Sequence, residues 1–175
     1  MKRTSFLWQG AGFAFSTLLG TLLHFLYDWT GGSLLSAPFS GVNESTWEHM
    51  KLLFWPMFLF ALIQRPFFRD RKDYWPVKGL GILLGLALIP VLFYTGRGVF
   101  GTYPDWVNIG IFYVSAALAY FLEWRLFRKD PLTRKGPWLA FAGICLLGVL
   151  FAAFTFAQPQ IPLFQDPLTG TYGMG

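Results

Sequence analysis

The chain has 175 residues, of which 54% are hydrophobic and only 13% are charged. A water-soluble domain carries about 25% charged residues, so this composition excludes an ordinary soluble domain and indicates a chain surrounded largely by lipid. The formal net charge of +5 is compatible with nucleic-acid binding, but the basic residues are interrupted by apolar stretches. Membrane topology explains them better, and we expect no nucleic-acid partner.

Five stretches of the sequence provide the roughly 20 apolar residues that a transmembrane helix needs. The first is predicted to be a retained helix, because it is long for a signal peptide and no small-residue cleavage site follows it closely. The sequence therefore predicts an all-α integral membrane domain over residues 1–157. Its spans are expected at residues 6–27, 45–64, 75–94, 106–127 and 137–156.

The basic residues are concentrated on one side of the predicted spans. Twelve of the 14 Lys and Arg residues precede the first span or lie between spans two and three or four and five, and only Lys51 and Arg97 fall on the other side. Since cytoplasmic loops carry the Lys and Arg excess, we predict an inside N-terminus and an outside C-terminus. Tryptophans near the span ends fit an interfacial aromatic belt, namely Trp8, Trp29, Trp47, Trp75, Trp106, Trp124 and Trp138.

Polar and small residues recur every four positions in the first predicted span, at Gly12, Ser16, Gly20, His24 and Asp28. Residues at this spacing share one face of a helix, and small residues let another helix approach closely in lipid. We expect Asp28 to hold the His24 imidazole, as carboxylates do behind many metal-bound histidines. The alternative is an interior histidine with a satisfied hydrogen bond and no further role.

The second predicted span begins in the stretch VNESTWEHMK, residues 42–51. Ser45 and Glu48 form the S-x-x-E pattern of a capping box, which by itself explains an acidic helix start. At 100° per residue, Glu44, Glu48 and Lys51 fall on one helix face, whereas His49 points elsewhere. Lys51 is the deepest of these groups and needs a partner in the membrane, for which Glu48 is the obvious choice.

The two histidines are predicted to meet at the outer ends of the first two spans, near Asp28 and the two glutamates. Two imidazoles and carboxylates are a ligand set for zinc or another divalent transition ion, here His24, His49, Glu44 and Glu48. Their spacing matches no metal motif, so a metal-free acid/base cluster that binds a polar ligand or relays protons is the alternative. The one cysteine, Cys145, excludes an intrachain disulfide and a multi-cysteine metal site.

The remaining residues, 158–175, are rich in Pro and Gly and are predicted to form a non-helical tail on the outer side. Apolar residues are interleaved with its turn signals, which is unusual for a disordered tail. We expect it to fold over the outer face of the bundle and to bring Asp166 towards His24 and His49.

Three stretches carry a resemblance: HFLYDWTG, VNESTWEHMKLLFWP and PLFQDPLTGTYG. Through them the chain resembles, over nearly its whole length, an uncharacterised family of small bacterial integral-membrane proteins. The resemblance implies a multi-pass protein of the bacterial cytoplasmic membrane and supplies no activity. The matching positions are Asn43, Glu44, Trp47, Glu48, His49 and Lys51 in a central motif, and Asp166, Pro167, Gly170 and Tyr172 in a tail motif.

Three functions are compatible with these patterns. The first is an outer polar site, with or without metal, that serves binding or hydrolytic chemistry; its candidate residues are His24, Asp28, Asn43, Glu44, Glu48, His49, Lys51 and Asp166. The second is a small oligomeric transporter or channel, which predicts ionisable residues at mid-membrane depth, where the spans have almost none. The third is an assembly or scaffold subunit with a membrane-protein partner. No motif of a familiar enzyme class is present, so enzymatic activity is left open.

Overall fold

A computed structural model describes residues 2–102, 104, 106–132 and 136–174 of the chain, and the described residues are helical with no β-strand. Five α-helices and two short 3₁₀ helices follow one another along the chain. They are α1 (Lys2–Trp29), α2 (Thr46–Gln64), η1 (Arg65–Phe68), α3 (Tyr74–Phe100), α4 (Trp106–Phe127), α5 (Pro137–Phe156) and η2 (Pro162–Phe164).

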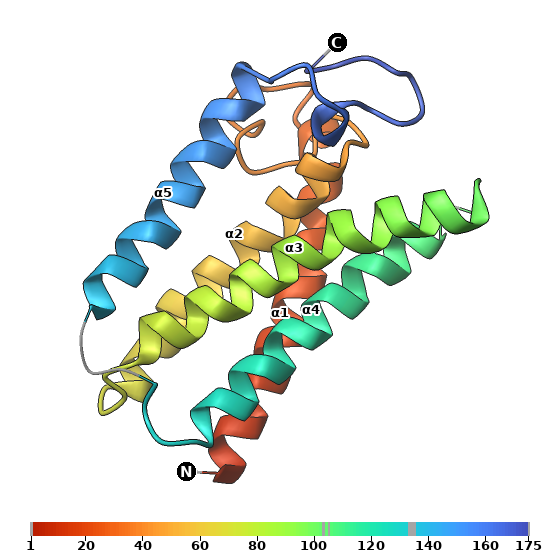
Figure 1. Cartoon of the computed structure of the whole chain (residues 1–175). Coiled ribbons are helices and arrows are strands. Elements are labelled where there is room, and N and C mark those ends of the chain that lie inside the picture. The colour runs from red at the N-terminus through yellow and green to blue at the C-terminus, as the bar shows by residue number, and fades with distance from the viewer. Residues whose placement is uncertain (1, 103, 105, 133–135, 175) are drawn as a thin grey trace.

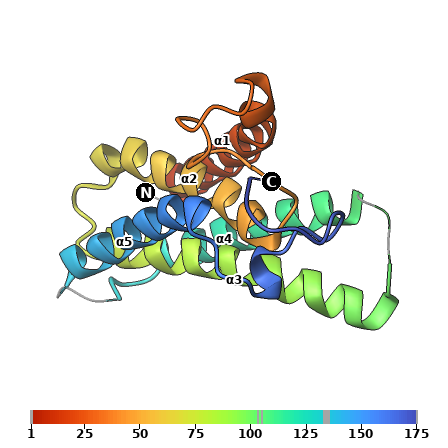
Figure 2. The same ribbon diagram turned by 90° about the horizontal axis from the view of Figure 1, so that it is seen from above.

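The helices run alternately up and down, so that the molecule has two ends (Figure 1). The long α1–α2 connection and the C-terminal tail lie together at one end, which we call the loop end. The N-terminus, η1 and the α4–α5 connection lie at the opposite end. Seen from above, α2 lies among the other helices, and it contacts all four of them (Figure 2).

Four helices are long and apolar enough to cross a membrane, as expected of a membrane protein: α1 over Ser5–Trp29, α3, α4 and α5. The sequence predicted a fifth span over residues 45–64, and α2 forms there but is not among the four. Its first turns contain Glu48, His49 and Lys51, which lower its mean hydropathy. Twelve of its 19 residues are buried, so most of the α2 surface is covered by other parts of the protein.

The small-residue face of α1 packs against α2 and α4, as its spacing predicted. Gly12, Ser16 and Gly20 are buried, and the Ser16 hydroxyl is hydrogen-bonded to the Tyr120 hydroxyl at 2.7 Å. A Cβ on Gly20 would lie only 2.9 Å from the carbonyl oxygen of Leu52. Pro56 has no N–H to offer that carbonyl within α2, so the glycine allows α1 to approach where the helix ladder is interrupted.

The tryptophans divide between the surface and the core. Trp29, Trp106 and Trp138 are exposed, as an interfacial belt requires, whereas Trp75 and Trp47 are buried. The Trp47 ring lies 4.5 Å from the ring of Phe151 in α5 and 4.6 Å from that of Phe164 in η2. These contacts attach the tail to the first turn of α2.

Candidate functional site

Ser45 is the N-cap of α2, and its hydroxyl accepts a hydrogen bond from the Glu48 backbone N–H at 3.3 Å. The reciprocal half of a capping box is absent here, because the Ser45 N–H donates to Asn43 Oδ1 at 2.9 Å instead. The Glu48 carboxylate is thereby released from capping and turns into the protein interior. The predicted helix start is confirmed, and Asn43 takes the role expected of Glu48.

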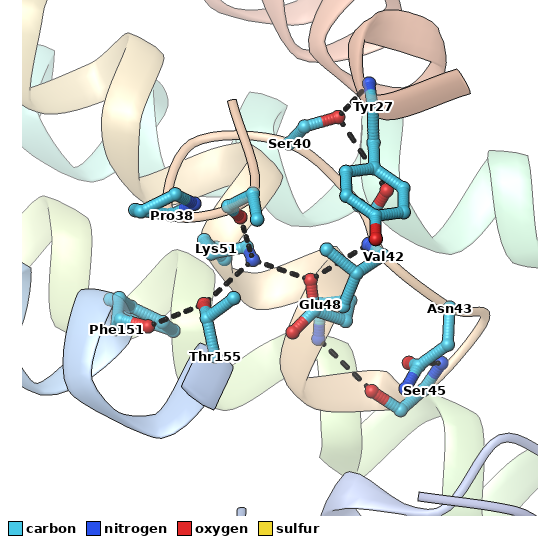
Figure 3. Close-up of polar contacts among 12 residues, drawn as sticks. Tyr27, Pro38, Ser40, Val42, Asn43, Ser45, Glu48, Lys51, Phe151 and Thr155 are labelled. Atoms are coloured by element: carbon cyan, nitrogen blue, oxygen red, sulfur yellow. Dashed lines mark hydrogen bonds and ion pairs between the residues drawn. The ribbon is translucent and has the colours of Figure 1, made fainter. Parts of the chain in front are cut away.

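Glu48 and Lys51 form the ion pair that the depth of Lys51 predicted (Figure 3). Lys51 Nζ lies 2.6 Å from Glu48 Oε2, and both side chains are fully buried. The ammonium also donates to the Ala37 carbonyl at 2.8 Å and to Thr155 Oγ1 at 3.0 Å, so all three of its donors are used. Because its partners come from α5 and the α1–α2 connection, the lysine fastens both to α2.

The two histidines meet across the carboxylate of Glu44. His24 Nε2 lies 3.5 Å from Glu44 Oε1, and His49 Nε2 lies 3.6 Å from Glu44 Oε2. The ring centroids of the two imidazoles are 5.9 Å apart. Unlike the Lys51–Glu48 pair, the three side chains are partly open, with exposures of 30% for His24, 40% for Glu44 and 23% for His49. We call these three residues the histidine cluster.

One hydrogen bond determines how the His49 ring can act. Its Nδ1 lies 3.0 Å from the Ser45 carbonyl oxygen, and a carbonyl can only accept, so Nδ1 carries a proton. In the neutral ring, Nε2 then presents a lone pair towards Glu44. Nε2 can therefore accept a hydrogen bond from a ligand in the neutral ring and donate one when the ring is protonated.

The histidine cluster lies on the wall of a pocket of about 410 Å³ between α1, α2 and α4. Such a volume is within the range of about 300–1,000 Å³ that is usual for small-molecule sites. Arg97 of α3 and Asn108 of α4 add polar groups to the wall, while Phe25, Phe112 and Tyr113 supply aromatic surface. A smaller space of about 20 Å³, large enough for one water molecule, is also lined by Glu44, His49 and Asn108.

The tail completes the loop end of this site. Asp166 Oδ2 accepts a hydrogen bond from the Glu44 N–H at 3.2 Å, and its Oδ1 accepts one from the Leu168 N–H at 2.7 Å. Asn43 Nδ2 donates to the Gly173 carbonyl at 2.9 Å. Pro167 and Leu168 therefore close one side of the pocket. Asp166 therefore holds the backbone of Glu44 in place.

A family model for a family of unknown function (DUF6512) matches residues 2–174. The chain belongs to this family. The comparisons with curated proteins and with solved structures found no match. The family match covers nearly the whole chain, and it leaves the function to be argued from the site.

Two sequence expectations about the site differ from the geometry in the DUF6512 protein. Glu44 lies with the histidines and not with Glu48 and Lys51, because α2 begins at Thr46 and a helical angle does not extend to the residue before its cap. Asp28 is exposed near the end of α1, and His24 faces Glu44 instead. The small-residue face of α1 packs inside the protein as predicted, but Asp28, the last residue of that series, lies beyond the packed part of the helix.

The metal set expected from the sequence is only partly assembled. His24, His49 and Glu44 converge, whereas the Glu48 carboxylate accepts hydrogen bonds from Lys51 and from the Val42 N–H at 3.1 Å. Among the residues that the structure describes, no group of three or more His, Cys, Asp or Glu side chains is placed to hold a metal ion. Glu48 is therefore engaged by Lys51 and Val42 and lies apart from the other three members of the expected set.

A second buried ion pair was missed in the sequence. Lys78 Nζ of α3 lies 2.6 Å from Glu123 Oε2 of α4, and both side chains are fully buried. The sequence pattern places Lys78 among the basic residues between the second and third spans, where no buried partner is expected. The available signal was Glu123, an acid inside a predicted span, which needs a cationic partner in lipid. Arg97 and Asn108 were also missed, because only folding brings them to the pocket.

Proposed function

We propose that this DUF6512 protein is a multi-pass membrane protein that binds a small polar ligand in the pocket beside the histidine cluster. One observation supports the proposal most directly: two imidazoles and a carboxylate converge, partly exposed, on a pocket of about 410 Å³. Pockets of this kind, mostly apolar with a few convergent polar groups, are the usual form of ligand sites.

The contrast with the two lysine pairs supports the same assignment. Lys51–Glu48 and Lys78–Glu123 are fully buried pairs with N–O distances of 2.6 Å, and none of these four residues lines the pocket. The histidine cluster has longer contacts and partly exposed side chains, so its polar atoms remain accessible to a ligand. We propose recognition through hydrogen bonds and proton exchange at Nε2 of both imidazoles.

The side of the membrane follows from charge. Arg65, Arg69, Arg71 and Lys72 lie in or next to η1 at the opposite end, where Arg125 of α4 also lies. Since cytoplasmic segments carry the basic excess, we propose that the opposite end faces the cytoplasm and that the loop end faces outward. In a bacterial cytoplasmic membrane, the pocket then opens on the extracytoplasmic side.

Transport is a second candidate, and the Lys78–Glu123 pair supports it. The scarcity of ionisable groups inside the predicted spans counts against transport. However, this pair lies within two helices that are apolar enough to cross a membrane. Ionisable residues at such positions mark substrate or proton pathways in many membrane proteins. Binding at the histidine cluster would then be the first step of a passage through the bundle.

The binding proposal is testable because His24 and His49 are the only histidines in the chain. In detergent-solubilised protein with histidine ¹³C-labelled at Cε1, the imidazole NMR spectrum should contain two signals. We expect both to shift in a saturable manner with acetate or inorganic phosphate, and to shift less in the Glu44→Gln variant. Asp28→Asn, which changes an exposed carboxylate on the same helix as His24, is the matched control and should behave as wild type.

Zinc titration and elemental analysis distinguish the metal alternative. Stoichiometric zinc in the purified protein, lost in both His24→Ala and His49→Ala, would replace the polar-ligand assignment by a metal site. Imidazole signals that respond to none of acetate, phosphate and zinc in folded protein would refute a ligand site at the histidine cluster.

A further inference from the structure

We infer that the pocket takes an amphiphile with an anionic head and a single aliphatic chain, which enters from the lipid through an opening between α1 and α4. This inference rests on the proposed function and specifies its ligand class. Three features carry it: an exposed apolar rim, hydrogen-bond donors elsewhere on the pocket wall, and contacts that close the interface between the two helices further along.

The rim of the pocket is apolar and lies on two helices that are apolar enough to span a membrane. Phe25 of α1 and Ile109 of α4 both line the pocket, and 44% and 60% of their surfaces are exposed. Tyr113, one turn further along α4, is 39% exposed. An aqueous pocket seldom has such a border, whereas an aliphatic chain that leaves the pocket between α1 and α4 would continue directly into the bilayer.

The seam between α1 and α4 is closed towards the opposite end. The Phe13 and Tyr113 rings meet edge to face at a centroid distance of 6.4 Å, and the Ser16–Tyr120 hydrogen bond joins the helices further along. Gly20 lies directly against the Phe112 ring. The opening is therefore limited to the part of the seam next to the histidine cluster, which sets the depth of the head group.

The head group would meet donors at Arg97 and at protonated imidazoles, which offset the Glu44 carboxylate on the same pocket wall. The Arg97 guanidinium is always positive and presents donors in the planar arrangement that suits carboxylate and phosphate oxygens. The imidazoles of His24 and His49 add N–H donors when they are protonated. Asn108 also lines the pocket, and its Oδ1 is buried with no partner among the described residues, so a water beside the head group would complete its hydrogen bonding.

Dodecyl phosphate is a suitable probe, with the protein reconstituted in phosphatidylcholine nanodiscs. We expect ¹⁴C-labelled dodecyl phosphate to show a saturable component of one molecule per chain above its partition into the bilayer. Dodecanoate should compete, because it shares the anionic head and the chain, and comparison of the two distinguishes a phosphate from a fatty-acid source. Arg97→Gln should weaken binding by about tenfold, the effect of losing one hydrogen bond to a charged group.

A pair of tryptophan substitutions separates the pocket from the lipid-facing surface. Thr21 is exposed, lines the pocket and donates its hydroxyl only within its own helix, to the Thr17 carbonyl at 2.8 Å. Thr21→Trp should therefore fill the pocket and abolish saturable binding. Leu22→Trp, at the neighbouring position that is 52% exposed, is the matched control and should leave it intact.

The outcomes distinguish this inference from the proposed function. If inorganic phosphate competes as well as dodecanoate, the ligand is a head group alone, which overturns the amphiphile but leaves the polar site. Equal competition by dodecyltrimethylammonium, or equal binding in Thr21→Trp, would show ordinary lipid contact and overturn the inference. The absence of a saturable component in a protein whose imidazole signals respond to acetate or phosphate would do the same.

Discussion

The histidine cluster at the loop end and the Lys78–Glu123 pair towards the opposite end both place opposite charges inside an apolar bundle, yet their surroundings differ. The lysine pair has a contact of 2.6 Å and no exposed surface. The cluster has contacts of 3.5 and 3.6 Å, and its side chains are 23–40% exposed. In the first case the two charges are paired with each other and buried, and in the second the ionisable groups are left accessible to another molecule.

This difference separates stabilising groups from groups that can bind. A buried ion pair contributes little net stability, but the removal of one partner leaves an uncompensated charge in an apolar interior. Partly exposed pairs are screened and contribute between about 0 and 1 kcal/mol. Substitutions in the lysine pairs should therefore change folding, whereas substitutions in the cluster should change ligand response.

The largest effect is expected for Lys78→Met. This substitution isolates the Glu123 carboxylate, and should lower the free energy of unfolding by about 3–5 kcal/mol. The measurement is unfolding of the detergent-solubilised protein by SDS, followed by circular dichroism. The double variant Lys78→Met/Glu123→Leu removes both charges and should recover most of the loss. A double variant as unstable as the single one would show that the pair has a role other than mutual charge compensation.

Gly81→Ala should have an intermediate effect. A Cβ at this position would overlap the Glu123 side chain, which Lys78 holds in place, so overpacking should cost about 1–3 kcal/mol. Gly79→Ala in the same helix is the matched control, because its Cβ would be 3.8 Å from its nearest neighbour, Ile144, an ordinary contact. Equal unfolding free energies for the two variants would mean that Glu123 moves freely, contrary to a sealed pair.

The smallest effect on stability is expected for Glu44→Gln. Its carboxylate is 40% exposed, so the free energy of unfolding should change by no more than about 1 kcal/mol. The same variant should nevertheless shift both imidazole NMR signals, because the carboxylate faces His24 and His49. A large loss of stability with unchanged imidazole signals would show that the cluster stabilises the fold, as the lysine pairs do, and would contradict its assignment as a binding group.

Much of the helical architecture is predictable because it depends on local patterns. The lengths of the apolar stretches predict helices close to α1–α5, the spacing of Gly12, Ser16 and Gly20 predicts the packed face of α1, and Ser45 predicts the start of α2. The relation of α2 to the membrane is less predictable, because its burial by four neighbouring helices is a tertiary property.

The site is only half predictable for a related reason. His24, Glu44 and His49 are visible as ionisable residues near span ends, but whether Glu44 faces Glu48 or the histidines depends on where α2 begins. Lys78 was hidden because basic residues near span ends are normally assigned to loops. Arg97 and Asn108 come from separate helices, and no sequence spacing relates them to the histidines.

One measurement compares the two kinds of charged group directly. Folded protein in nanodiscs is treated with diethyl pyrocarbonate and acetic anhydride, and modified residues are identified by peptide mass spectrometry, with SDS-denatured protein as the reference. The account predicts modification of His24 and His49, reduced by dodecyl phosphate, and protection of Lys51 and Lys78. Unreactive histidines, or lysines as reactive as in the denatured reference, would contradict it.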